Sequence, residues 1–316
     1  MGASATPPRA DIAVAASGGR DSTALLHATL RAALPLGVRV HALHVHHGLH
    51  PQAGQWAKQV SAQARRWGAS FHENQLAGAP APAESIEAWA RRGRYAALAV
   101  MARSAGCTLV LLAHHRRDQA ETVLLQLLRG GGARGLAAMP ADVVRDGIRW
   151  LRPWRDQPRE AIEAYLKRHR LRWVDDPGND DARYARNRLQ HRVWPALTAA
   201  FPQAEPALVG AAARAAEEAE ALRELAAIDA AHCLEGNALR IRAWCGLSPA
   251  RQALLLRRQI EAWSARGVPG TLVRRLMAEL PRTPSGHWPA PGGQLVLRRG
   301  GLRYVPTPSA AGQDSD

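Results

Sequence analysis

Cysteine is scarce in this chain. Its 316 residues include three cysteines, and Cys107, Cys233 and Cys245 are too few and too scattered for a disulfide framework or a Cys-x-x-Cys site. The opening residues, MGASATPPRAD, lack the apolar core of a signal peptide, and no run of about 18 apolar residues that could span a membrane occurs. We therefore expect a protein of the reducing cytoplasm with no membrane partner.

Lysine is almost absent as well. Of the 42 basic residues two are lysines, which leaves 40 arginines. A Walker-type phosphate loop needs Gly-Lys followed by Ser or Thr, but neither Lys58 nor Lys167 follows a glycine, so that class of nucleotide site is excluded. Arginine binds phosphate through its bidentate fork and stacks on bases. With a formal net charge of +15, this composition predicts a polyanionic partner, nucleic acid first and a membrane surface second.

The stretch AVAASGGRDSTALLHA, residues 13–28, predicts a turn from a strand into a helix. Its first part is short and apolar enough for a buried strand, and apolar residues at helical spacing follow from Ser22. Backbone N–H groups at a helix start carry partial positive charge, and Gly18 and Gly19, which lack Cβ, let an anion approach them closely. This loop therefore predicts a phosphate site. The alternative is an ordinary turn in which Asp21 or Ser22 caps a helix.

Predicted strands alternate with predicted helices through the first part of the chain. The alternation indicates an α/β fold, a Rossmann-like parallel sheet with helices on both faces. From about Glu205 one long helical run rich in Ala and Glu predicts a connector to a small α+β C-terminal domain with a terminal hairpin. We thus expect a nucleotide-binding domain over residues 1–204, and the helical connector with a C-terminal domain that binds nucleic acid over 205–316. The expected strands are 11–16, 38–45, 70–74 and 108–113, and the expected helices are 22–31, 52–67, 85–103 and 118–129.

Three polar motifs follow these strands: SGGRDS, HVHHGLH and AHHRRDQAET. Ligands of parallel α/β sheets bind beyond the carboxyl ends of the strands, so we expect the motifs to share one edge. Asp118 and Glu121, three residues apart at a helix start, would lie on one face. Asp21 and Asp118 suit Mg²⁺, which takes one or two carboxylates together with phosphate oxygens. The alternative is that Asp118 caps its helix and Glu121 lies on the surface.

Four histidines in HVHHGLH raise the question of a zinc site. On a strand, residues two apart share a face, so His44 and His46 lie together, whereas His47 falls in the following turn. No cysteine or carboxylate completes a closed zinc site, and we favour a loop that lines the nucleotide pocket.

Five segments in the same order resemble tRNA(Ile)-lysidine synthetases, a family of the PP-loop ATP pyrophosphatase superfamily. SGGRDS resembles the PP-loop itself; the others are HVHHGLH, EAWARRGRY, LLAHHRRDQAETVLLQLLRGGGARGLAAM, and LRPW followed by DDPGNDDARYARNRLQHRVWP. The likeness runs from Ser17 to about Pro195. The chain departs from the family pattern at His50, Gly178 and Gln190, where arginine, serine and arginine are usual.

The resemblance implies ATP-dependent ligation of L-lysine to C2 of the wobble cytidine in a tRNA(Ile) with a CAU anticodon. The cytosine C2 oxygen would attack the α-phosphorus of ATP and release pyrophosphate, and the lysine ε-amine would then attack C2 and expel AMP. Mg²⁺ is implied beside ATP, and homodimers are frequent in the family. The implied site residues are Asp21, Asp118 and Glu121 for catalysis, Asp21 and Asp118 for the metal, Ser17, Gly18, Gly19, Arg20, Asp21 and Ser22 for ATP, and Arg91, Arg94 and Asn187 for the substrate.

Two other functions stay open at this point. A tRNA thiolation enzyme on the same fold needs a cysteine pair or a metal cluster, and the scattered cysteines count against it. A non-catalytic basic RNA-binding protein would explain the charge, but not the acidic residues expected beside a phosphate loop.

Overall fold

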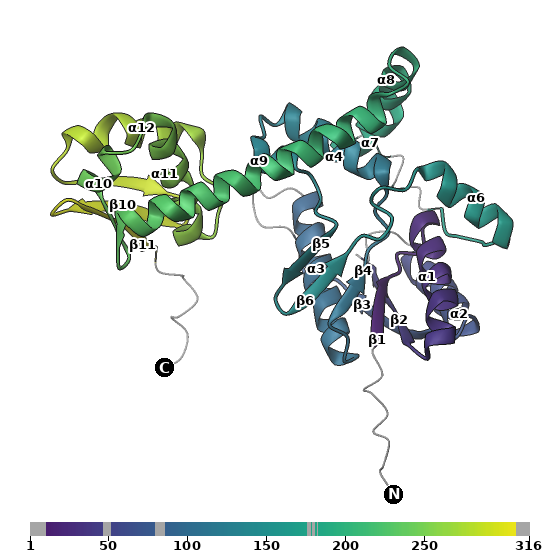
Figure 1. Ribbon diagram of the computed structural model, residues 1–316. Coiled ribbons are helices and arrows are strands. Elements are labelled where there is room, and N and C mark those ends of the chain that lie inside the picture. Colours follow the sequence, from purple (N-terminus) through teal and green to yellow (C-terminus); the bar gives the residue numbers. More distant parts are fainter. Residues whose placement is uncertain are drawn as a thin grey trace, which may run out of the picture. The chain divides into compact units, whose positions relative to one another are not determined.

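The computed structural model describes residues 11–46, 52–79, 86–175, 178, 181 and 183–307. The chain forms two compact units, Met1–Ala216 and Glu217–Asp316, which divide within one long helix, α9 (Ala204–Cys233) (Figure 1). Each unit has a sheet of its own. None of the helices in the described ranges is long and apolar enough to cross a membrane.

A six-stranded sheet in the order β3-β2-β1-β4-β6-β5 forms the centre of the first unit. All neighbours from β3 to β6 pair in parallel. The strand order reverses between β1 and β4, and at such a switch point a crevice opens beyond the carboxyl ends of the strands. The loops after β1 and β4 both begin there. The strands are β1 (Asp11–Ala15), β2 (Arg39–His46), β3 (Ser70–Gln75), β4 (Leu109–Leu111), β5 (Asp142–Arg145) and β6 (Ile148–Leu151).

Helices cover both faces of this sheet, because successive strand residues point to opposite sides. Ala13 packs in a cluster with Leu98 of α3, whereas Val14 packs in another cluster with Leu25 of α1 and Val60 of α2. The predicted α/β fold class is confirmed. The helices of this part are α1 (Arg20–Ala33), α2 (Ala53–Arg66), α3 (Ile86–Ser104), α4 (Arg116–Leu128), α5 (Ala133–Leu136) and α6 (Arg159–His169).

The hairpin of β5 and β6 was not expected from the sequence. β5 pairs antiparallel with β6 at the edge of the sheet. Its two turn residues, Asp146 and Gly147, have φ angles of 53° and 75°. Positive φ at both positions is the type I′ turn that Asp-Gly favours, so the dipeptide was an available signal.

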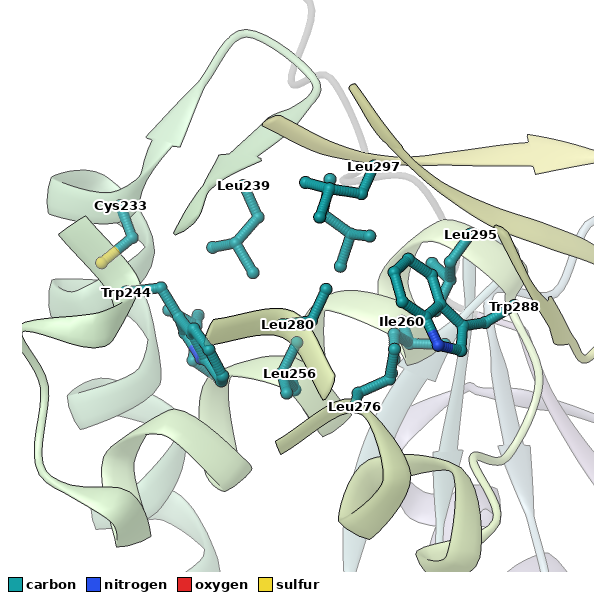
Figure 2. Packing of buried hydrophobic residues seen from close by; sticks show 12 residues of the cluster. Cys233, Leu239, Trp244, Leu256, Ile260, Leu276, Leu280, Trp288, Leu295 and Leu297 are labelled. Atoms are coloured by element: carbon teal, nitrogen blue, oxygen red, sulfur yellow. The ribbon is translucent and has the colours of Figure 1, made fainter. Parts of the chain in front are cut away.

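The second unit is the small α+β domain that the sequence predicts. Its sheet has the order β7-β8-β11-β10-β9, and β10 and β11 form the terminal hairpin through Arg299 and Gly300. Figure 2 shows the core, in which Trp244, Leu256 and Leu297 are at most 1% exposed. The elements are β7 (Leu234–Glu235), β8 (Ala238–Arg240), α10 (Ile241–Cys245), α11 (Pro249–Ser264), α12 (Gly270–Glu279), β9 (Gly286–Ala290), β10 (Gly293–Arg298) and β11 (Gly301–Pro306).

Candidate active site

Gly18 holds the loop after β1 in a conformation that favours glycine. Its φ is +90°, and a Cβ added there would lie 2.6 Å from Cγ2 of Val60. Its carbonyl oxygen accepts hydrogen bonds from the Val174 N–H at 2.9 Å and the Thr23 hydroxyl at 3.1 Å. The loop is thereby tied to α1 and to the segment that follows α6.

The helix that follows the loop presents an open N-terminus. α1 begins at Arg20, and its N-cap residue is Gly19, so no side chain caps the N–H groups of the first turn. Uncapped N–H groups of a first helical turn attract anions, and the helix dipole adds to that attraction. The Ser17 hydroxyl accepts from the Gly19 N–H at 3.3 Å and lies 3.0 Å from the Ser22 hydroxyl. Arg20 reaches α6 instead of the loop and donates to Glu163 at 3.0 Å.

Asp21 places a partly buried carboxylate at this helix start. Its Oδ1 is buried and accepts no hydrogen bond from any described residue, although Nε of Arg20 lies 3.6 Å away. Burial raises the pKa of Asp21, and the neighbouring charge of Asp118 adds to the rise. A buried carboxylate oxygen without a donor, beside a second acid, is a setting that a cation stabilises.

His115 lies between the two acids. Its Nε2 is 3.8 Å from Oδ2 of Asp21, and its Nδ1 is 3.6 Å from Oδ2 of Asp118. Asp118 accepts the backbone N–H of His115 at 2.8 Å, so it does cap α4, and it also pairs with Arg186. Burial alone would raise the pKa of Asp118, but the charges of Arg186 and the adjacent histidines outweigh it and lower the pKa. Asp118 is therefore both a helix cap and a charged member of the site.

Glu121 is buried, so the alternative of a surface residue is wrong. Its side chain is 1% exposed. Oε2 accepts the Gln190 amide at 2.8 Å and lies 3.3 Å from Nε of Arg186, whereas buried Oε1 has no donor among the described residues. Burial raises the pKa of Glu121 despite these two partners. The result is a carboxylate of raised basicity with one oxygen open.

Arg186 was not singled out from the sequence. It lies in α7 (Ala185–Arg188), directly before a π-helical turn, Leu189–Val193, that carries Gln190. Along the chain Arg186 is 68 residues from Asp118, so no local pattern connects them. The basic run ARNRLQHR was the available signal, but it does not indicate which arginine turns inward. Irregular π-helical turns often occur at functional sites.

The three predicted substrate-binding residues lie in different settings. Arg91 and Arg94 are exposed on α3, and the Arg91 guanidinium lies 5.3 Å from the centre of the Tyr95 ring. The Asn187 amide donates to the carbonyl oxygens of Gly178 and Asp181, each at 3.0 Å. Asn187 therefore holds the loop before α7.

Arg152, within LRPW, is a second buried arginine that no sequence pattern indicates. Although only 5% exposed, it donates to the Pro140 carbonyl at 2.8 Å and to the Tyr95 hydroxyl at 3.2 Å. Its Nε lies 3.3 Å from Nδ1 of His114. Burial lowers the pKa of His114 to about 3, and the charge of Arg152 adds to this effect. His114 is thus neutral and accepts through Nδ1.

The described histidines of HVHHGLH have partners of their own. Nδ1 of His44 donates to the carbonyl oxygen of Ala16 at 2.7 Å, which supports the base of the phosphate loop. His46 lies 3.0 Å from Glu73. Within the described ranges no group of three or more His, Cys, Asp or Glu side chains is arranged to hold a metal. His47 and His50 lie outside the described residues.

Comparison with known proteins shows which family contains this chain. Residues 3–197 match the family model described as a PP-loop domain. A tRNA(Ile)-lysidine synthase of Bordetella pertussis is 44% identical over 267 residues, which cover 82% of this chain and 83% of that protein. The chain belongs to the tRNA(Ile)-lysidine synthase family.

Further lysidine synthases extend the likeness along the chain. That of Ralstonia nicotianae is 42% identical over 294 residues, or 92% of this chain and 63% of the relative. That of Alkalilimnicola ehrlichii is 41% identical over 304 residues, or 95% of this chain and 67% of the relative. The chain thus spans less than two thirds of the length of the Ralstonia protein.

The fold also occurs outside the lysidine synthase family. The U34-tRNA thiolase NcsA from Methanococcus maripaludis, solved with its 4Fe-4S cluster, is similar with a TM-score of 0.56 and 13% identity. The match covers 65% of this chain and 71% of the thiolase. At this identity the likeness shows the fold alone.

Two departures from the lysidine synthase pattern fall at contacts in the structure. Gly178 contributes its carbonyl oxygen to Asn187, a contact that any residue type supplies. Gln190, at a position where the resemblance leads us to expect arginine, donates to Glu121. A neutral donor lowers the pKa of a carboxylate less than a cation does, so Gln190 leaves Glu121 the stronger base.

Proposed function

We propose that the protein is a tRNA(Ile)-lysidine synthase, which ligates L-lysine to C2 of the wobble cytidine of a CAU anticodon at the expense of ATP. One observation carries the proposal: the phosphate loop, Asp21, and the acids Asp118 and Glu121 meet at the switch point of the sheet. Family membership supports tRNA(Ile) as the polynucleotide substrate. We propose the cytoplasm as its compartment, because ATP, lysine and tRNA are all present there.

In the first step the cytosine C2 oxygen bonds to the α-phosphorus of ATP, and the bond from that phosphorus to pyrophosphate breaks. The backbone N–H groups at the start of α1 bind the phosphate oxygens. Ser17 and Ser22 fix the loop through their hydroxyl contact at 3.0 Å. The loop is therefore ordered before the nucleotide binds, which reduces the entropic cost of binding.

Asp21 and Asp118 are the residues that would hold Mg²⁺. Oδ1 of Asp21 has no donor among the described residues, and a carboxylate has about four acceptor positions, so Asp118 keeps capacity beside its contacts to His115 and Arg186. When bound, the ion neutralises negative charge on the departing pyrophosphate.

In the second step the lysine ε-amine bonds to C2, the bond from C2 to oxygen breaks, and AMP leaves with that oxygen. The amine must first lose a proton. Glu121 has an open oxygen and a raised pKa, and we assign it the role of holding the ammonium and accepting that proton. Arg186 keeps the adjacent Asp118 ionised.

The cysteines disfavour thiolation. Cys107 precedes β4 and so lies at the end of the sheet opposite the switch point, and burial raises the pKa of its thiol to about 11. Cys233 and Cys245 belong to the second unit. The described part of the catalytic unit therefore offers no cysteine pair and no thiolate nucleophile.

Incubation with ATP, labelled lysine and bulk tRNA tests the proposal. We expect label in tRNA that requires ATP, with AMP and pyrophosphate as products in equal amounts. ATP turnover without label in tRNA would overturn the proposed reaction, and tRNA binding without ATP turnover would favour a non-catalytic RNA-binding protein.

A further inference from the structure

Three hydrogen bonds connect α1, which begins at the phosphate loop, to α6. The contacts involve the first, second and last part of α1, so the end of α6 lies beside the end of α1 that is farthest from the loop. At a rise of about 1.5 Å per residue, α1 carries this pair roughly 20 Å from the loop. The contacts are Arg20 to Glu163 at 3.0 Å, His27 to Tyr165 at 2.9 Å and Arg31 to His169 at 3.4 Å.

The chain then returns from the end of α6 to the phosphate loop. Arg170 ends the helix in the left-handed conformation, with φ at 50°. The carbonyl oxygen of Arg172 accepts the Gln63 amide at 2.8 Å, and the Val174 N–H donates to Gly18 at 2.9 Å. The returning segment is thus fixed at both ends.

Exposed cations recur along the last turn of α6 and this returning segment: Lys167, Arg168, Arg170 and Arg172. We call residues 167–173 the basic strip; they read KRHRLRW. Arg168, Arg170 and Arg172 are exposed, and no described carboxylate lies within ion-pair distance of any of them. Leu171 between them is 9% exposed and packs with Leu166, which anchors the backbone while the arginines point outward.

An exposed aromatic residue ends the basic strip beside the phosphate loop. Trp173 is 37% exposed and its indole N–H donates to Asp175 at 2.7 Å, which fixes the ring. Arginine forks on phosphates, combined with a fixed aromatic ring for base stacking, are the features by which proteins bind RNA strands.

We propose that the basic strip binds the backbone of the tRNA whose wobble nucleotide occupies the active site. The inference rests on the proposed function, because it assumes that a nucleotide of a longer RNA lies at the loop. The nucleotides next to the wobble position must then cross the surface beside the loop. The basic strip is a cationic part of that surface, and Val174, directly after it, contacts Gly18. A lipid surface would match the charge, but not the continuity with a nucleotide site.

A matched pair of triple variants tests the proposal. R168Q/R170Q/R172Q removes three charges from the basic strip, and R103Q/R129Q/R145Q removes three exposed charges elsewhere on the same unit. For each variant and the wild type, one measures the Kd for a tRNA(Ile) transcript between about 50 and 200 mM salt, lysine incorporation, the thermal midpoint, and binding to phosphatidylserine vesicles.

The strip variant should bind the transcript roughly 10- to 100-fold more weakly near 100 mM salt, with a salt slope smaller by about 2 to 3. Its KM for tRNA should rise while kcat at saturating tRNA and the thermal midpoint stay unchanged, and the control variant should match the wild type. Equal tRNA affinity in both variants overturns the proposal, as does a loss of vesicle binding alone. If the wild type incorporates no lysine yet the strip variant still loses tRNA affinity, the proposed reaction fails and the RNA surface stands.

Discussion

Among single residues, Asp21 is the one whose substitution should affect catalysis most. Asp21→Asn should lower ATP-dependent lysine incorporation on the order of 100-fold or more, because the charge that faces phosphate and metal is lost. The substitution should not destabilise the fold. Burial raises the pKa of Asp21, so above that pKa the buried charge costs free energy of folding, and at pH 8 the variant should melt at the same temperature or higher.

Asp142→Asn is the matched control for that substitution. Asp142 lies in β5, is exposed and pairs with Arg149 rather than with site residues. Its replacement should leave lysine incorporation unchanged. Full activity of Asp21→Asn, with an unchanged Mg²⁺ requirement, would remove Asp21 from the mechanism.

The pKa of Glu121 predicts the acid side of the pH profile. Burial raises that pKa, so the carboxylate takes up a proton as the pH falls through a value above the ordinary 4.5 and can then no longer accept one from lysine. The kcat/KM for lysine should therefore fall as the pH falls below that pKa.

Glu121→Gln should abolish this acid limb of the pH profile and lower the rate of lysine transfer on the order of 100-fold. The variant should still release pyrophosphate in its first turnover. An acid limb that is unchanged from the wild type would show that a group other than Glu121 accepts the proton.

The acidic residues of the site were predictable from the sequence, whereas their arginine partners were not. The three-residue spacing of Asp118 and Glu121 fixes their common helix face in advance. Arg186 and Arg152 could not be assigned in this way, because each meets its partner only after the chain has folded back over many residues. A sequence rich in arginine gives no local sign of which guanidinium becomes buried.

Among the helices and strands, a matched pair of glycines tests the close packing of the loop between β1 and α1: Gly18 lies in that loop, and Gly37 lies between α1 and β2. Gly18 and Gly37 both have positive φ, but a Cβ at Gly18 would meet Val60 at 2.6 Å, whereas nothing lies within 4 Å of one at Gly37. Gly37→Ala should cost about 1 kcal/mol of stability from backbone strain. Gly18→Ala should cost roughly 1 to 3 kcal/mol more, and it should raise the KM for ATP.

Val60→Ala in the Gly18→Ala background is the control that separates the clash from the strain. Removing the side chain should restore part of the lost stability if the two groups collide. Equal melting temperatures of the two glycine variants, measured by calorimetry, would contradict the close approach of the loop to α2.

The elements themselves were predictable to different degrees. The period of α3 and the alternation of strands and helices are visible in the apolar pattern, and the long α9 is visible in its composition, which is rich in Ala and Glu. The strands β5 and β6 have four residues each, too few for a period, and only their Asp-Gly turn marks them. The π-helical turn that brings Gln190 to Glu121 has no sequence signature, because it follows from tertiary contacts.

For the whole molecule, the division within α9 predicts that the first unit binds ATP and that both units contribute to tRNA binding. A chain that ends at Ala216 keeps the Arg116 to Glu205 contact at 2.7 Å and all the predicted ATP residues. It should bind ATP as the full chain does. Its affinity for tRNA should fall by about tenfold or more, because the exposed arginines of the second unit are gone. Undiminished tRNA affinity in filter binding would confine the RNA surface to the first unit.

Nucleoside mass spectrometry of the tRNA after reaction shows whether one site both activates the wobble cytidine and joins lysine to it. A tRNA(Ile) transcript with a CAU anticodon should yield lysidine in place of the wobble cytidine when ATP and lysine are both present. A transcript with uridine at that position, and the Asp21→Asn enzyme, should yield none. An unchanged cytidine, a sulfur-containing nucleoside, or equal modification of the uridine transcript would show that the protein does not synthesise lysidine.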